Sequence, residues 1–303
     1  MTRNILSAVI ILFVFTLQSH ATDALVSTDW VAENQDNPDV RIVEVSVEPG
    51  QFDRGHISGA VNLNWHTDLV DQVQRDLISK EDFEALLSQK GIDEQTTVVL
   101  YGDNNNWFAA WGAWVFTIYG HDDIRLMDGG RDKWEAEGRQ LSGRAVDHPQ
   151  TDYTVTNEND DLRVFLPDVL DIVEGDNPGA LVDIRSSDEY SGKIIAPDGV
   201  QELAVRAGHI PGAVNVTWSN IVDDDGTFLA EDELKQVYAD QGIDGSEPIV
   251  TYCRIGERSS HTWFALYHIL GYDAKNYDGS WTEYGNSVGV PIENPEGTVW
   301  TGQ

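Results

Sequence analysis

The chain repeats itself once, and this repeat constrains its fold more than any other feature of the sequence. GHISGAVN (residues 55–62) returns as GHIPGAVN (residues 208–215). KGIDEQTTVVLYG (residues 90–102) returns as QGIDGSEPIVTYC (residues 241–253), and LMDGGRDKW returns as NYDGSWTEY. The offset stays near 150 residues, which is the length of a whole domain rather than of a solenoid unit. The sequence therefore predicts two copies of one domain.

Each copy alternates short apolar runs with segments of helical periodicity. In the second copy we expect strands at 180–184, 212–216, 248–252 and 274–277, and helices at 230–240, 259–270 and 280–284. In the first copy we expect strands at 40–45, 60–63, 97–101 and 124–127, and helices at 80–89 and 107–119. This alternation predicts α/β domains, each built on a mostly parallel sheet flanked by helices.

Residues 1–21 have the features of a secretory signal peptide. Arg3 precedes a 13-residue apolar run at 5–17, and Ser19-His20-Ala21 fits a small-x-small cleavage site. A helix that spans a membrane needs about 20 apolar residues, so an uncleaved anchor is the less favoured alternative. We therefore expect a mature chain from about Thr22 that is periplasmic or secreted and has no membrane anchor.

A polar stretch separates the two copies. It covers residues 139–161 and contains HPQTDYTVTNENDD, which has the composition of a linker. The expected organisation is a signal peptide at 1–21, a first domain at 22–140, a linker at 141–161 and a second domain at 162–303.

The charge of the chain excludes some partners. There are 52 acidic against 19 basic residues, for a formal net charge of −33. A surface of this sign repels polyanions, so no nucleic acid is expected as a partner, and anionic membranes are also disfavoured. The acidity itself is interpreted as a strongly solvated surface.

Cys253 is the only cysteine, and it follows an apolar strand at its carboxyl end, where open α/β sheets bind ligands. The loop CRIGER (residues 253–258) then leads into a helix, so backbone N–H groups and the helix dipole form an anion cradle. Gly256 suits the tight curvature, and Arg254 and Arg258 add cationic donors. We expect Cys253 to be an accessible, nucleophilic thiolate; the alternative is a buried core cysteine.

These motifs resemble the rhodanese family of sulfurtransferases. YCRIGERSSHTWF is similar to the active-site loop of two-domain thiosulfate sulfurtransferases, and GHIPGAVN with a preceding LVDIR is a further family signature. The resemblance covers nearly all of the mature chain, as two rhodanese-like domains in tandem. It implies that Cys253 takes the outer sulfur of a small-molecule donor as a persulfide and passes it to cyanide or a thiol. It also implies that no metal or organic cofactor is needed and that the two-domain form can act as a monomer.

Arginines are expected to bind the anionic donor. By resemblance, Arg185 in LVDIRSSDEY binds the substrate, and an ion pair with an acid such as Glu189 is the alternative. Arg254 matches the arginine that follows the family's cysteine. Ile255 departs from the lysine of vertebrate-type enzymes, and Arg258 is expected to supply that charge. The loop backbone around the persulfide comprises Ile255, Gly256, Glu257 and Ser259.

Other functions compete with this one. Enzymes that use 3-mercaptopyruvate carry a weakly charged loop of the type CGSGVT, so Arg254 and Arg258 favour thiosulfate. Cysteine phosphatases and arsenate reductases have five residues between cysteine and arginine, whereas four separate Cys253 from Arg258, and Glu257 would repel phosphate. A non-catalytic sulfur carrier would hold the persulfide for a dedicated protein partner.

The first copy lacks the chemistry of the second. YGDNNNWF replaces YCRIGERSS, with Gly102 at the position of the cysteine. We expect this domain to support the second one and to help form the cleft between them. His56 and His209 occur in the repeated GHI motif of both copies, which favours a structural role. His261 is also expected to be structural.

Overall fold

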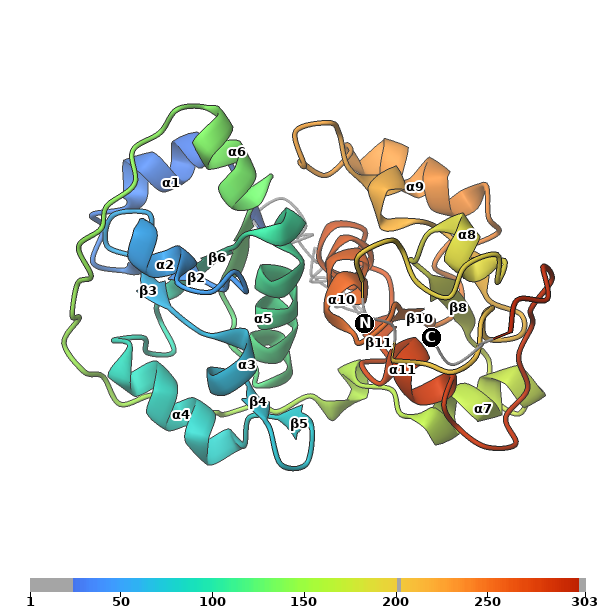
Figure 1. The fold of residues 1–303 in the computed structure, drawn as a ribbon. Helices are drawn as coiled ribbons and strands as arrows, with labels where there is room; N and C mark the ends of the chain where they lie inside the picture. The colour runs from blue at the N-terminus through green and yellow to red at the C-terminus, as the bar shows by residue number, and fades with distance from the viewer. Residues whose placement is uncertain (1–23, 201–202, 300–303) are drawn as a thin grey trace, which may run out of the picture.

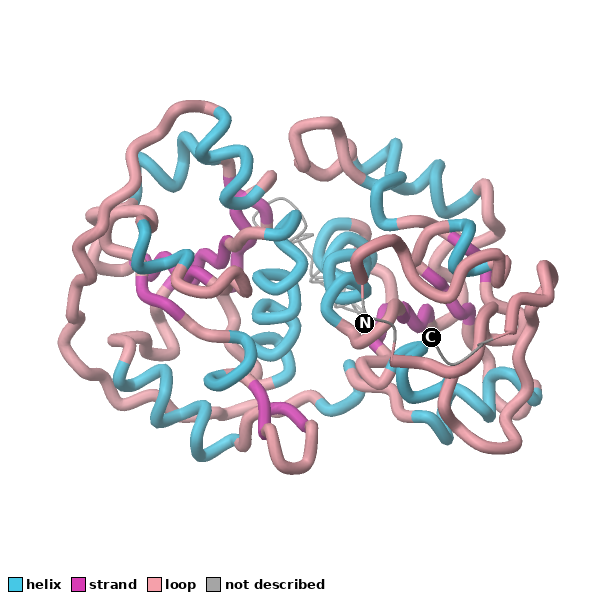
Figure 2. Tube along the Cα trace, in the orientation of Figure 1, coloured by secondary structure: helices cyan, strands magenta, loops and turns pink. Residues whose placement is uncertain are grey.

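The chain forms two α/β lobes that lie side by side (Figure 1). The computed structural model describes residues 24–200 and 203–299, so the expected signal peptide lies outside the described residues. Each lobe has a central parallel sheet flanked by helices (Figure 2). This confirms the fold class that the alternating pattern predicts.

The sheet of the first domain has the strand order β1-β7-β6-β2-β3, and all its neighbouring strands are parallel. The four expected strands are present, and β1 and a small antiparallel hairpin, β4-β5, were not anticipated because two-residue strands leave no periodicity to detect. The bounds are β1 (Leu25–Val26), β2 (Val40–Glu44), β3 (Val61–Asn62), β4 (Val70–Asp71), β5 (Asp76–Leu77), β6 (Thr97–Tyr101) and β7 (Ile124–Met127).

The sheet of the second domain repeats the plan with the order β11-β10-β8-β9. Its middle strands are apolar because both faces are covered. The bounds are β8 (Ala180–Asp183), β9 (Val214–Asn215), β10 (Ile249–Tyr252) and β11 (Ala274–Asn276).

Helices follow the strands in both domains. The first domain has α1 (Thr28–Asn34), α2 (Gln51–Arg54), α3 (Trp65–Asp68), α4 (Lys80–Gln89), α5 (Trp107–Ile118) and α6 (Gly130–Ala136). The second has α7 (Leu166–Glu174), α8 (Ser187–Tyr190), α9 (Glu231–Ala239), α10 (Glu257–Phe264) and α11 (Ser280–Tyr284). The helix expected at 259–270 begins two residues earlier and continues as a π-helix over Ala265–Ile269.

Helices α5 and α10 pack against each other at the centre of the molecule (Figure 1). These two helices follow equivalent strands, so the interface joins the same element of each copy. The Trp107 and Trp218 rings meet edge to face, 4.9 Å apart, and Thr117 Oγ1 lies 3.3 Å from His268 Nε2. The cysteine loop, which leads into α10, therefore lies next to the first domain.

The two domains also exchange contacts through their hairpin regions. Arg75, at the β4-β5 turn, donates to Asp278 of the second domain. The equivalent turn of the second domain presents Asp225 to Lys133, and Phe228 N donates to Asp128 Oδ1. The repeat aligns Asp128 with Asp278, so the interface has approximate twofold symmetry.

Residues 143–159 contain no helix or strand, and they run along the first domain. Thr151 N donates to Ser88 O, and Asn159 N donates to Ile118 O. The predicted linker is thus bound along the first domain's surface, while its exact limits stay a prediction. Across residues 24–200 and 203–299, no helix has both the length and the apolar character needed to cross a membrane.

Candidate active site

Cys253 lies where β10 ends and before α10 begins, as the sequence predicts. Its Sγ accepts a hydrogen bond from Gly256 N at 3.1 Å. The side chain is 0% exposed, so the expectation of an accessible thiol is wrong for this conformation. Packing of α10 against the first domain and the core around the sulfur explain the burial. A donor molecule can reach the sulfur only if neighbouring side chains move.

Gly256 gives the loop its shape. Its φ is +100°, a region that glycine occupies without strain. A Cβ built on Gly256 would also lie 2.8 Å from Asp278 Cα, closer than side chains pack. Only glycine therefore lets the amide of this residue turn toward the sulfur.

A network of buried polar side chains fixes the start of α10. Ser259 Oγ lies 3.6 Å from Cys253 Sγ and also donates to Asn276 Oδ1 at 2.7 Å. Ser260 Oγ and Asn276 Nδ2 donate to Gly256 O at 2.8 and 3.2 Å. Because these groups are buried and satisfied, the loop is held in one arrangement. Sequence reasoning named Ser259 for its backbone and missed Asn276.

Ser280 holds the backbone of the cysteine itself. Its Oγ accepts from Cys253 N at 3.1 Å, and Trp281 N donates to Cys253 O at 3.1 Å. The repeat could have pointed to Ser280, because Gly130 is its counterpart in the copy without a cysteine.

Arg258 of the cysteine loop lies between Glu189 and the first domain. Its side chain is 12% exposed, its Nη2 lies 3.6 Å from Glu189 Oε1, and its guanidinium stacks over the Trp107 ring of the first domain. Burial disfavours the cation, but the negative charges of Cys253 and Glu189 outweigh this and raise the Arg258 pKa. Glu189, expected as an alternative partner of Arg185, thus pairs with Arg258.

Arg185 is buried in an ion pair. It is 1% exposed, and its Nη2 donates to Asp183 Oδ2 at 2.6 Å and to Gly208 O at 2.7 Å. Burial opposes the charge, but Asp183 raises the pKa of Arg185 above its ordinary value. The guanidinium also lies over the Trp281 ring, 4.7 Å from its centroid. Its assignment to substrate binding stays a prediction, and an ion pair with Asp183 replaces the one considered with Glu189.

A first-domain residue reaches the cysteine loop. Arg75 Nη2 donates to Ile255 O at 3.1 Å and Nη1 pairs with Asp278 at 2.9 Å. Sequence reasoning missed Arg75, because the repeat gives no sign that a surface hairpin crosses to the other domain. Arg254 is half-buried in the same loop, where its carbonyl accepts from Thr282 N at 2.9 Å.

Glu257 is the acid nearest the sulfur. Cys253 Sγ lies 3.9 Å from Glu257 Oε2, and Glu257 is 4% exposed. Burial raises the pKa of this carboxyl, and the charges of Arg258, Arg254 and Arg75 offset only part of that effect.

The three conspicuous histidines are packed rather than presented to a substrate. Burial lowers the pKa of His261 to about 3, and its ring stacks on Phe228. His56 stacks on Phe52, and His209 stacks on Tyr190 in the same way. These contacts support the structural roles expected for them.

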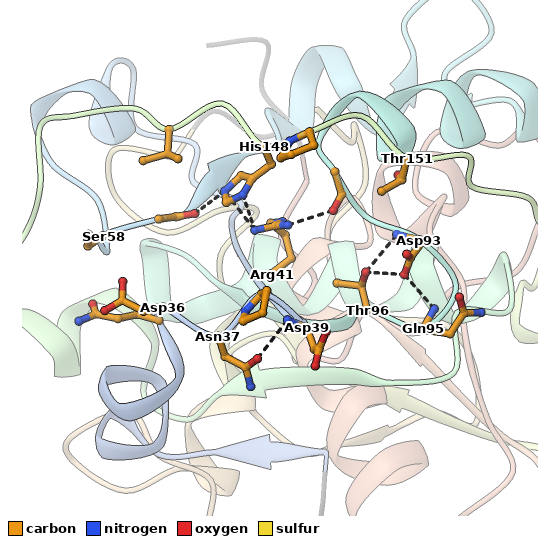
Figure 3. Close-up of a pocket in the computed structure, with 16 residues that line it drawn as sticks. Asp36, Asn37, Asp39, Arg41, Ser58, Asp93, Gln95, Thr96, His148 and Thr151 are labelled. Carbon is orange, nitrogen blue, oxygen red and sulfur yellow. Dashed lines mark hydrogen bonds between the residues drawn. The ribbon is translucent and has the colours of Figure 1, made fainter.

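Two cavities differ in how close they lie to the cysteine loop. A cavity of about 560 Å³ in the first domain is lined by Arg41 and His148, whose Nη1 and Nδ1 atoms lie 2.6 Å apart (Figure 3). Arg41 belongs to the amino-terminal half of β2, so this cavity lies away from the sheet edge that bears Cys253. A second cavity of about 320 Å³ is lined by both domains and includes Ile255 of the cysteine loop. Among the described residues no group of three or more histidine, cysteine or acidic side chains could hold a metal.

The protein is a tandem of two α/β domains of one plan. One of these domains holds the buried Cys253 in a loop before a helix, so the protein has a single thiol centre. The model of the Rhodanese-like domain matches residues 27–137 and 166–287. The chain belongs to the rhodanese family, which is a family of sulfurtransferases.

Two relatives of known sequence align with this chain over almost their whole length, and a solved structure shares its fold. A protein of Mycolicibacterium smegmatis named "Putative thiosulfate sulfurtransferase" is 52% identical over 274 residues, 90% of this chain and 98% of the relative. "Sulfur carrier protein TtuD" of Thermus thermophilus is 50% identical over 278 residues, again 90% and 98%. The anaerobic ergothioneine biosynthesis enzyme of Chlorobium limicola shares the fold, with a TM-score of 0.78 at 23% identity over 91% of this chain and 71% of that one.

Proposed function

We propose that the protein is a thiosulfate sulfurtransferase that carries sulfane sulfur as a persulfide on Cys253. The single observation that carries this is the Gly256 N–H aimed at Cys253 Sγ, 3.1 Å away, at the start of α10. A helix N-terminus favours negative charge, so the same cradle suits a thiolate and a persulfide. The relative named as a thiosulfate sulfurtransferase supports the choice of donor.

The reaction proceeds in two displacements. The Cys253 thiolate attacks the outer sulfur of thiosulfate, the S–S bond of the donor breaks, and sulfite leaves with the bonding electrons. Cyanide or a thiol then attacks the outer sulfur of the persulfide and regenerates the Cys253 thiolate. Arg258 and Arg254 attract the dianionic donor, and Arg185, whose Nη2 is bound to Asp183 Oδ2 and Gly208 O, is proposed to assist with its positive charge.

Thiocyanate release from thiosulfate and cyanide tests the proposal. Wild-type protein should turn over and Cys253→Ser should lose the activity completely; thiocyanate formation by the variant would refute the assignment. Running 3-mercaptopyruvate in parallel decides the donor, since the arginines predict the higher kcat/KM for thiosulfate.

A sulfur carrier is the second candidate, because of the relative named as one. The burial of Cys253 favours it, since a partner protein could open the site. A carrier would gain persulfide from thiosulfate yet release thiocyanate far more slowly than ordinary enzymes turn over.

We also propose that the protein is exported, on the basis of residues 1–21. Sequencing the amino terminus of the protein purified from its native cells should give a chain starting near Thr22, in the periplasmic or secreted fraction. An intact Met1 terminus in the cytoplasm would contradict export.

A further inference from the structure

The cysteine loop contains an ionisable group that the two displacements do not use. Glu257 lies four residues after Cys253, at the first position of α10, and its Oε2 is 3.9 Å from Sγ. It is 4% exposed. Charged side chains are seldom buried unless they have a partner or a task.

The first domain shows what this position does when no sulfur chemistry is needed. The repeat aligns Glu257 with Asn106, which also folds back on the residue four positions earlier, accepting from Gly102 N at 2.9 Å. A neutral amide is therefore sufficient to hold the loop in the first domain. The acid appears in the domain that has the nucleophile, which indicates a chemical role for its charge.

The acceptor decides whether a proton must move. Transfer to cyanide consumes no proton, because thiosulfate and cyanide give sulfite and thiocyanate. Transfer to a thiol is different, because a thiol must lose its proton before it becomes a nucleophile. The attacking sulfur would stand within about two S–S bond lengths of Cys253 Sγ, about 4 Å. Glu257 Oε2, 3.9 Å from the same Sγ, is the carboxylate oxygen within reach of that space.

We propose that Glu257 is the proton carrier of this site and that its presence adapts the enzyme to thiol acceptors. This inference rests on the persulfide cycle proposed above. Sulfite leaves in the first displacement without a proton from Glu257, whose carboxylate is ionised. The carboxylate then takes the proton of the incoming thiol, the thiolate bonds to the outer sulfur, and the S–S bond to Cys253 breaks. The products are the acceptor's persulfide anion and the Cys253 thiolate, and Glu257 passes the proton to solvent before the next cycle, so that atoms and charge balance.

The surroundings of Glu257 suit this task. The charged and titratable groups around it are Cys253, Arg254 and Arg258 of its own loop and Arg75 of the first domain. Burial raises the carboxyl pKa above its ordinary value, and the charges of the three arginines favour its ionised form. A proton carrier works best when its pKa lies near the working pH.

Glu257→Gln tests the inference with two acceptors on one enzyme. The variant keeps the shape of the side chain, so persulfide loading measured by intact mass and thiocyanate formation should stay within about threefold of wild type. Transfer to a simple thiol such as dithiothreitol at pH 7 should fall about 10²- to 10⁴-fold, the usual contribution of such a group. The defect should shrink as the pH approaches the acceptor thiol's own pKa (about 8.5 for free cysteine), because the acceptor then ionises without help.

Glu231→Gln is the matched control, because Glu231 occupies the same first position of α9 and is exposed; both activities should be unchanged. Equal losses of activity with cyanide and with the thiol in Glu257→Gln, or no loss with the thiol, would overturn the inference.

A solvent isotope effect gives a test that does not depend on how the variant folds. Wild-type transfer to the thiol should show this effect and transfer to cyanide should not; equal effects with both acceptors would also contradict the inference. Failure of wild-type protein to form any persulfide would instead refute the proposed function.

Discussion

Both domains bury a carboxylate and a guanidinium at the end of equivalent strands, β2 and β8, but they take the guanidinium from different elements. In the first domain Arg131 of α6 pairs with Glu44 at 2.9 Å and donates to Gly55 O at 2.7 Å. In the second, Arg185 pairs with Asp183 and donates to Gly208 O, the counterpart of Gly55. The comparison teaches that this cation holds the GHI loop to the sheet, with or without a nucleophile nearby.

An aromatic residue of the second domain occupies the position that Arg131 has in the first. The repeat aligns Arg131 with Trp281, and Trp281 is the ring over which the Arg185 guanidinium lies. The position that supplies the cation in one domain thus supplies the supporting ring in the other. The functional difference between the domains therefore lies in the loops that begin at Gly102 and Cys253.

Breaking the ion pair in each domain should give the largest effect on stability. Arg131→Met and Arg185→Met each leave a buried carboxylate unpaired, which costs about 3–5 kcal/mol. Thermal unfolding should show similar losses for the two variants. The Michaelis constant for thiosulfate should rise in Arg185→Met alone. If this constant is unchanged at a temperature where the variant is fully folded, Arg185 does not belong to the substrate-binding residues.

The cysteine position of the first domain should not accept a side chain. A Cβ on Gly102 would lie 2.2 Å from Val45 O, so Gly102→Ala and Gly102→Cys should each lose about 1–3 kcal/mol or more through overpacking. Gly143→Ala is the control, since nothing lies within 4 Å of its Cβ. Equal melting temperatures for all three variants would show that the loops differ less than the structure indicates.

Removing Arg75 should have the smallest effect on stability. Arg75 is 57% exposed in its pair with Asp278, so Arg75→Ala should cost about 1 kcal/mol or less, and so should Lys133→Ala at the symmetrical contact. The two variants should differ in kcat, which should fall in Arg75→Ala alone, because Arg75 also donates to Ile255 O of the cysteine loop. Identical kcat values for both variants would show that this hairpin does not position the loop.

The repeat and the alternating pattern were enough to predict the two parallel sheets and the place of Cys253, because strand and helix periods are local properties. The sequence could not reveal that Arg258 pairs with Glu189, that Arg75 crosses from the other domain, or that the thiol is enclosed. These features depend on how the domains pack, which leaves no periodic trace. Ser280 lies between these cases, since comparing the copies position by position would have found it.

The most direct measurement is the mass of the peptide that contains Cys253 after incubation of the protein with thiosulfate. The account predicts one added sulfur on this peptide, which cyanide removes as thiocyanate and which Cys253→Ser lacks. A wild-type peptide that never gains this mass, under conditions where the folded protein is intact, would contradict it.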